Sequence, residues 1–268
     1  MFQKLRKSKK LVLVAMACAT FAIAGCGSDT TKNAADNGNA VTWSETFDGT
    51  KTDFAVKSSP THAVSMSQAT TEMMLQLGLE DKMAGTAFKE EEIYPPLQAT
   101  YDKVKVLSDK WPSYEVFMSV KPDFATGWPD SFSKRAIPAD KMIAQKVNIW
   151  LPESMLSTKA DLETNFSDMI KLGEIFGVKP KAEEWVAGQR KTLAAIQDKL
   201  KDLPRKRVFI YDSEDGQPFT AFEGYTTNIL KLIGADNVMS GLGVDKTCAK
   251  GSWETVIAQN PDYIIIAD

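Results

Sequence analysis

Histidine and cysteine are scarce in this chain, which contains one His and three Cys among its 268 residues. A site for bare zinc or manganese needs several His, Cys, Asp or Glu side chains together. His62 lies in a stretch that predicts a strand, where a structural role is favoured over metal ligation. The sequence also lacks a G-x-S-x-G nucleophile motif, and residues 241–247 match the phosphate-loop pattern incompletely. We therefore expect no metal site, no cofactor and no enzymatic activity.

Long apolar runs are missing as well. Residues 1–25 combine a basic start with the apolar run 11–24, which is shorter than the ~18 residues of a membrane helix. This pattern is typical of a secretion signal. The run ends in Ile23-Ala24-Gly25-Cys26, which resembles the bacterial lipobox. The resemblance implies cleavage before Cys26 and acylation of that residue, which would anchor the protein through several acyl chains. An ordinary signal with an incidental cysteine is the alternative.

The segment after the signal is small and polar up to residue 40, which predicts a flexible tether. With Cys18 in the signal and Cys26 acylated, Cys248 is the remaining thiol, so no intramolecular disulfide is possible. Five of the 32 basic residues lie in the signal, so the rest of the chain carries 27 basic against 35 acidic residues, a net charge of −8. This balance argues against nucleic-acid binding and permits docking on a basic partner.

One pattern occurs twice: residues 113–124 and 252–263 share Ser, an aromatic residue, Glu, apolar positions, Pro, Asp and a second aromatic residue at identical spacing. Residues 71–78 likewise match 227–234, and in both copies a second glycine follows seven residues later, at Gly85 and Gly241. Two copies are too few for a solenoid. The repeat therefore predicts two similar lobes that enclose a cleft.

Strand and helix patterns alternate in the manner of a parallel α/β sheet. We expect a hairpin over residues 41–56, turning at Asp48-Gly49, and a helix capped by Thr70 or Thr71. The other expected helices cover residues 160–176 and 182–203, and the second of these is a rigid spine. The expected strands are 62–66, 82–84, 124–126, 146–150, 208–211 and 263–267. The predicted domains are a signal peptide (1–25), a tether (26–40), an N-terminal α/β lobe (41–158), a helical segment (159–204) and a C-terminal α/β lobe (205–268).

The strand predicted at the end of the sequence is apolar on both faces over residues 264–266. Such strands need covering elements on each side. None follows in this sequence, so we expect the C-terminal lobe to be incomplete.

The lipobox, the tether, the two α/β halves and the long helix between them resemble the class III solute-binding lipoproteins of bacterial ABC importers, which carry ferric siderophores, haem or vitamin B12. The resemblance is most specific over residues 71–85, 115–128 and 254–263. It implies an anchored, extracytoplasmic monomer that delivers an iron(III)-siderophore or similar metal chelate to a permease. Cobalamin or haem is the alternative ligand. A surface-anchored α/β hydrolase and an adhesion or sensor module are the alternatives from other classes.

In that family each lobe presents a glutamate that pairs with an arginine pocket on one of the two permease subunits. The matching residues are Glu115 and Glu254, one in each copy of the repeat. Both also follow a serine that predicts a helix N-cap, so stabilisation of the helix dipole is the alternative role.

Ligands of open α/β sheets bind at the carboxyl ends of the strands. Aromatic side chains near those ends suit a bulky, partly apolar chelate, and a neighbouring arginine suits its anionic oxygens. The predicted ligand-binding residues are Gln68, Phe88, Trp111, Trp128, Arg135, Phe222 and Tyr225. Core packing is the alternative for each aromatic residue.

Overall fold

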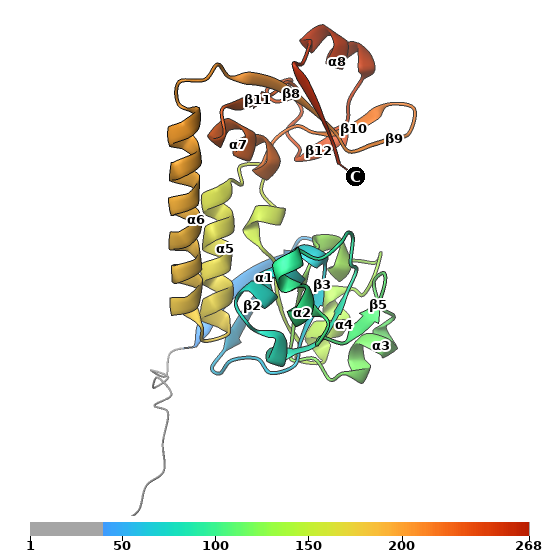
Figure 1. Ribbon diagram of the computed structural model, residues 1–268. Coiled ribbons are helices and arrows are strands. Elements are labelled where there is room, and N and C mark those ends of the chain that lie inside the picture. The colour runs from blue at the N-terminus through green and yellow to red at the C-terminus, as the bar shows by residue number, and fades with distance from the viewer. Residues whose placement is uncertain (1–39, 268) are drawn as a thin grey trace, which may run out of the picture. The chain divides into compact units, whose positions relative to one another are not determined.

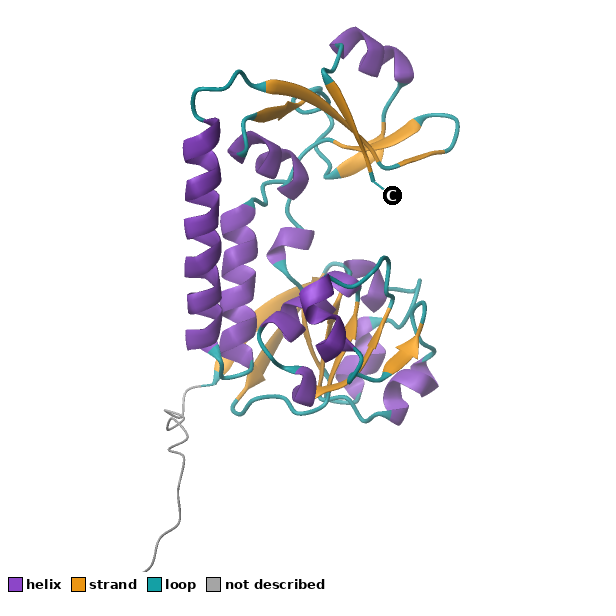
Figure 2. Ribbon diagram, in the orientation of Figure 1, coloured by secondary structure: helices purple, strands orange, loops and turns teal. Residues whose placement is uncertain are grey.

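Two separate parallel sheets, each with its own helices, form the framework of residues 40–267, the part of the chain that the computed structural model describes (Figures 1 and 2). The predicted signal and tether, including Cys26, lie outside the described residues. The α/β class predicted from the sequence is confirmed, and the two copies of the repeat have not merged into one sheet.

The N-terminal sheet has five parallel strands in the order β5-β4-β3-β6-β7. Its interior strands β3 and β6 are buried on both faces, as the central strands of a parallel sheet are. The strands are β3 (Ala63–Met66), β4 (Met83–Ala87), β5 (Val106–Ser108), β6 (Phe124–Gly127) and β7 (Asn148–Trp150). The connecting helices are α1 (Gln68–Gln76), α2 (Gln98–Tyr101), α3 (Tyr114–Ser119) and α4 (Ala139–Ala144), with 3-10 turns at Glu80–Lys82, Pro95–Leu97 and Pro129–Phe132.

The predicted hairpin is confirmed: β1 (Val41–Phe47) pairs antiparallel with β2 (Thr50–Val56) around Asp48 and Gly49, which both have positive φ. Trp43 Nε1 donates to the Ile149 carbonyl at 2.7 Å, and Glu45 accepts from the Leu151 N–H at 3.0 Å. These two contacts attach the hairpin to the edge strand β7.

The segment between the sheets is a pair of helices. After a 3-10 turn (Glu153–Met155), α5 (Leu162–Ile175) is followed by α6 (Lys179–Leu200), and the two helices pack side by side (Figure 1). A Cβ at Gly173 would lie 2.7 Å from the Ala182 Cβ, so this glycine permits the close approach. The predicted long helix is present, but the connection between the lobes is a pair of helices and not one. Only Ala182 and Val186 of α6 are buried, and α5 contributes most of the buried residues of the pair. Pro180 lies in the first turn of α6, where proline is tolerated.

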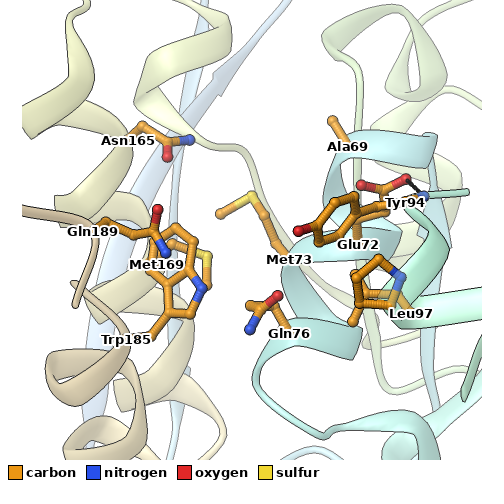
Figure 3. A pocket seen from close by; sticks show the side chains of 11 residues that line it. Ala69, Glu72, Met73, Gln76, Tyr94, Leu97, Asn165, Met169, Trp185 and Gln189 are labelled. Atoms are coloured by element: carbon orange, nitrogen blue, oxygen red, sulfur yellow. Dashed lines mark hydrogen bonds between the residues drawn. The ribbon is translucent and has the colours of Figure 1, made fainter. Parts of the chain in front are cut away.

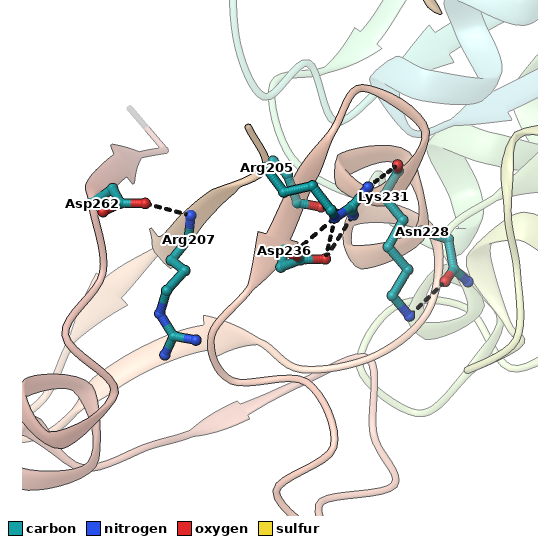
Figure 4. Close-up of polar contacts among 7 residues, drawn as sticks. Arg205, Arg207, Asn228, Lys231, Asp236 and Asp262 are labelled. Atoms are coloured by element: carbon teal, nitrogen blue, oxygen red, sulfur yellow. Dashed lines mark hydrogen bonds and ion pairs between the residues drawn. The ribbon is translucent and has the colours of Figure 1, made fainter. Parts of the chain in front are cut away.

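The C-terminal sheet has the parallel order β11-β8-β13, formed by β11 (Ala235–Asn237), β8 (Lys206–Tyr211) and β13 (Tyr263–Ile266). A second, antiparallel sheet joins β9 (Ser213–Glu214), β10 (Pro218–Ala221) and β12 (Cys248–Lys250). The helices are α7 (Tyr225–Leu232) and α8 (Trp253–Gln259). Arg205 donates to both carboxylate oxygens of Asp236 and to the carbonyls of Lys231 and Ala235, which fastens the end of α7 to β11 (Figure 4).

The sequence repeat corresponds to a repeated arrangement of strands in the two lobes. In each lobe the first strand, β3 or β8, lies between the strand after its first helix, β4 or β11, and the strand after the Pro-Asp pair, β6 or β13. Before each Pro-Asp pair stands a residue with left-handed φ, Lys121 in one copy and Asn260 in the other. Such a residue ends the helix and redirects the chain into the strand.

The aspartate of each Pro-Asp pair joins the strand that follows it, β6 or β13, to the backbone at the start of the central strand, β3 or β8. Asp123 Oδ1 accepts from the His62 N–H at 3.0 Å, and the Asp123 N–H donates to the His62 carbonyl. Asp262 makes the same two bonds with Arg207, as Figure 4 shows in part. We call these contacts the aspartate clamps. The exposed His62 therefore precedes β3, and the clamp uses its backbone.

Two expectations need correction. Ser67 caps α1, because its hydroxyl accepts from the Thr70 N–H, and Thr70 itself lies within the helix. Gly78 and Gly234 are equivalent, since both follow a helix with positive φ, but Gly85 lies in β4 whereas Gly241 lies in a turn. The missing cover of β13 agrees with the expectation: its side chains are 46–68% exposed over residues 263–266, so this apolar strand is only partly covered among the described residues.

Asp123→Ala tests the clamp of the N-terminal lobe. The Thr61 and His62 N–H groups and the Thr61 hydroxyl would lose their acceptor. We expect the free energy of unfolding, measured with urea, to fall by about 1–3 kcal/mol. Asp109→Ala, at an exposed position, is the matched control. Equal stability of the two variants would contradict the clamp.

Glu45 predicts a pH dependence of stability. Burial raises the pKa of Glu45 from 4.5 to about 7, and this effect outweighs the hydrogen bond from the Leu151 N–H, which lowers the pKa. A carboxyl whose pKa rises on folding binds its proton more tightly in the folded state, so stability falls as pH rises from about 4.5 to 7. The loss approaches roughly 3 kcal/mol at ~1.4 kcal/mol per pH unit. The free energy of unfolding of Glu45→Gln should change less between pH 5 and 8 than that of the wild type. The same pH dependence of the free energy of unfolding in both proteins would refute the assignment of this effect to Glu45.

Candidate functional site

A cavity of about 410 Å³ opens at the carboxyl ends of the N-terminal strands. Phe88 directly follows β4, Trp128 directly follows β6, and Trp111 lies just beyond β5. These three predicted residues are brought together here. The full lining is Phe88, Glu90, Trp111, Trp128, Pro129 and Asp130. Its position is where open α/β sheets bind ligands.

Two of the aromatic rings form a stacked wall. The ring centroids of Phe88 and Trp111 are 4.6 Å apart, with 13° between the ring planes. The Trp111 indole is fixed by a hydrogen bond from Nε1 to the Met66 carbonyl at 3.2 Å. Phe88 has φ +60°, a conformation that costs a bulky residue about 1–3 kcal/mol and is concentrated at functional sites. The fold therefore holds the Phe88 ring against Trp111 at a local cost.

Trp128 is oriented by a carboxylate. Its Nε1 lies 3.1 Å from both oxygens of Glu90. The Glu90 backbone is held in turn by Gln68, whose Oε1 accepts from the N–H groups of Glu90 and Glu91 at 3.0 and 2.7 Å. Trp128 thus depends on Gln68 through one intermediate residue.

Gln68 was predicted to contact the ligand, and the structure gives its side chain another task. Besides the two bonds it accepts, its Nε2 donates to Glu72 Oε1 at 2.9 Å and to the Glu92 carbonyl at 3.0 Å. A primary amide has two donor hydrogens and two acceptor lone pairs. All four are used within the protein, so we treat Gln68 as the residue that positions the 90–92 loop.

Beneath α1 lies a buried hydroxyl network that the sequence analysis missed. Thr71 Oγ1 lies 2.6 Å from Thr86 Oγ1 and 2.8 Å from Ser65 Oγ, and Ser65 Oγ lies 2.7 Å from Thr70 Oγ1. All four side chains are nearly inaccessible to solvent. The network joins the start of α1 to β3 and β4, and so fixes Gln68 relative to the strand ends. The only sequence signal was the density of Ser and Thr between residues 65 and 71.

Arg135 is already paired. Its guanidinium contacts Asp130 at 2.5 Å, and both side chains are more than half exposed. It does not line the cavity, and Asp130 does. The positive charge predicted to hold anionic ligand oxygens is therefore offset within the protein.

The two candidates from the C-terminal lobe lie elsewhere. Phe222 is 3% exposed and packs in a core cluster with Phe209 and Val238. Tyr225 begins α7 and is half-buried, and burial raises the pKa of its phenol. Neither lines the cavity at the strand ends.

At the end of β8 a second aromatic group was missed by the sequence analysis. Tyr211 stacks on Trp253 with 6.0 Å between centroids, and Trp253 Nε1 donates to Glu214 at 3.4 Å. An indole held by a carboxylate near a strand end therefore occurs in both lobes. Tyr211 and Trp253 are separated by most of the lobe's sequence, which hid the pairing.

A larger cavity of about 540 Å³ lies among helices (Figure 3). Trp185, Gln189, Asn165 and Met169 of α5 and α6 face Met73 and Gln76 of α1, with Tyr94 and Leu97 on the same side as α1 (Figure 3). No strand end contributes to it. We therefore place the candidate ligand site at the smaller cavity, where three aromatic rings gather at the sheet edge.

The two repeat glutamates are presented alike. Glu115 and Glu254 are the second residues of α3 and α8, and both are exposed. Each helix is capped by a serine hydroxyl, Ser113 accepting from the Val116 N–H and Ser252 from the Thr255 N–H, at 3.3 and 3.1 Å. Hydrogen bonds from its own N–H and from Ser113 hold the pKa of Glu115 below its usual range. Both carboxylates are turned outward.

Residues 64–268 match the family described as periplasmic binding protein. The chain belongs to this family. Proteins of this family are substrate-binding proteins of ABC transporters rather than enzymes, and solved periplasmic binding proteins share the fold of this chain. The hydrolase alternative is therefore dropped. Among the described helices, none combines the length and the apolar character needed to cross a membrane.

Several proteins resemble this periplasmic binding protein. A crystal structure of a periplasmic binding protein from Veillonella parvula is 96% identical, covers 86% of this chain and 78% of its own, and has a TM-score of 0.85. The uncharacterized ABC transporter substrate-binding lipoprotein YvrC of Bacillus subtilis is 26% identical over 98% of this chain and 82% of its own. An ABC-type Fe3+-hydroxamate transport protein from Saccharomonospora viridis shares the fold at 19% identity, with a TM-score of 0.66 over 84% of this chain and 79% of its own.

Gln68→Leu tests how this periplasmic binding protein holds its acidic loop. Without the amide, the Glu90 and Glu91 N–H groups lose their acceptor, and we expect their amide hydrogen exchange to accelerate at least tenfold. Gln98→Leu, which removes an exposed amide bonded to Asp102 at 2.7 Å, is the control. Unchanged exchange at residues 90 and 91 would show that the loop does not depend on Gln68.

Proposed function

We propose that this protein is the lipid-anchored, extracytoplasmic receptor of an ABC importer, which captures a metal chelate and delivers it to a permease. The observation that carries the proposal is the aromatic cavity at the strand ends, where Phe88, Trp111 and Trp128 converge. Stacked rings bind flat or bulky apolar surfaces well and gain little from a bare hydrated ion. The metal thus enters already wrapped in its chelator, and an iron(III)-siderophore is the leading candidate. Cobalamin or haem is the alternative.

Delivery is assigned to Glu115 and Glu254. Their equal positions on capped helices, one in each lobe, support docking on a partner built from two similar subunits. Each carboxylate is exposed and free of ion pairs among the described residues. A basic pocket on each permease subunit would receive one of them, and such charge complementarity sets the orientation of a complex.

Anchoring is assigned to Cys26. Cleavage before it and acylation of its thiol and amine would hold the protein at the outer face of the membrane. The polar segment up to residue 40 would then let the folded part reach the permease.

The double variant Glu115→Lys/Glu254→Lys separates docking from ligand capture. Reversing both charges places like charges against the basic pockets, so we expect chelate uptake by cells that depend on this protein to fall at least about tenfold. The affinity of the purified variant for the chelate, measured by quenching of tryptophan fluorescence, should stay at the wild-type value.

The variant Glu183→Lys/Glu184→Lys makes the same change in charge at exposed positions of α6 and is the control. Normal uptake by the docking variant, or equal loss in the control, would defeat the docking assignment. Lack of binding to every ferric siderophore, haem and cobalamin would defeat the chelate assignment.

A further inference from the structure

We infer that the chelate is neutral or positively charged and that this site rejects polyanionic chelates. The inference rests on the proposed function and specifies its ligand. Both charged side chains that line the cavity, Glu90 and Asp130, are carboxylates. A carboxylate close to an anionic ligand raises its binding free energy, whereas the same group attracts a cationic one.

The charge of Glu90 is fixed in place. Its two oxygens share the Trp128 indole N–H, and its backbone is held by Gln68. No ion pair neutralises Glu90 among the described residues. Lys89 precedes it, but Glu91 and Glu92 follow, so the exposed loop is net acidic. A chelate that stacks on the indole of Trp128 must approach this charge.

The positive charge near the cavity, that of Arg135, is already paired with a carboxylate. Arg135 contacts Asp130 at 2.5 Å, so an anionic ligand would have to break this pair before it gained a guanidinium contact. A neutral or cationic ligand leaves the pair intact. The half-buried aromatic rings near Glu90 also attract cationic groups.

The end of β8 in the other lobe has the same character. Asp212, Glu214 and Asp215 follow one another there within four residues and are exposed. Among residues 40–267, the cation paired with this group is Lys250, which contacts Asp215 at 2.7 Å. Glu214 accepts from the Trp253 indole, as Glu90 does from Trp128. The strand-end loops of both lobes therefore combine aromatic rings with uncompensated carboxylates.

The test is a fluorescence titration of the purified protein at fixed ionic strength with chelates of different charge. The probes are ferrioxamine B (cationic), ferrichrome and cyanocobalamin (neutral), and ferric enterobactin and haemin (anionic). We expect at least one neutral or cationic probe to bind ten or more times tighter than both anionic probes. Tighter or equal binding of ferric enterobactin or haemin would overturn the inference and leave the proposed function standing. Binding of none of the five would instead overturn the proposed function.

Two variants check that the carboxylates cause the preference. Glu90→Gln keeps an acceptor for the Trp128 indole but removes the charge, and Asp130→Asn releases Arg135 from its ion pair. We expect each to narrow the ratio of affinities between the best neutral or cationic probe and ferric enterobactin at least threefold. Glu184→Gln on α6 is the control and should leave the ratio unchanged. An unchanged ratio in both cavity variants would contradict the carboxylate mechanism.

Discussion

The aspartate clamp is the constraint that holds the central strand of each lobe to its neighbour. In each lobe one aspartate joins the start of β6 or β13 to the backbone at the start of β3 or β8, through one hydrogen bond accepted by its carboxylate and one donated by its own N–H. The helix that carries Glu115 or Glu254 leads directly into this clamp. Because the clamp binds backbone groups, it does not depend on which side chain stands at the partner position, His62 in one lobe and Arg207 in the other.

The ligand cavity depends on a different kind of constraint. Its rings lie on strand-end loops, which have no ladder of hydrogen bonds to hold them. The fold compensates with hydrogen bonds made outside the cavity lining or on its protein side: a saturated amide at Gln68, a hydroxyl network under α1 and the indole bond from Trp111 to Met66. Pre-organisation of this kind lowers the entropy lost on binding.

Features set by local sequence could be predicted, whereas features set by contacts between distant segments could not. The Asp48-Gly49 turn predicted the hairpin, and the Ser113 cap predicted the helix that carries Glu115. The sequence repeat predicted the two lobes. The aromatic residues after β4 and β6 could be placed at one cavity because the carboxyl ends of parallel strands meet at one edge of a sheet. The hydrogen bonds of Gln68 to the 90–92 loop could not be predicted because that loop lies more than twenty residues away. Phe222 shows that a ring after a strand can equally pack inward.

The left-handed backbone conformation of Phe88 lowers the stability of the fold but places its ring in the candidate ligand site. Glycine or asparagine would relax the main chain there more easily than a bulky residue, and would abolish the stack on Trp111. Selection for heat resistance alone would favour such replacements. Variants selected for heat resistance should therefore lose the aromatic stack of the candidate ligand site at this position first, while their lobes remain folded.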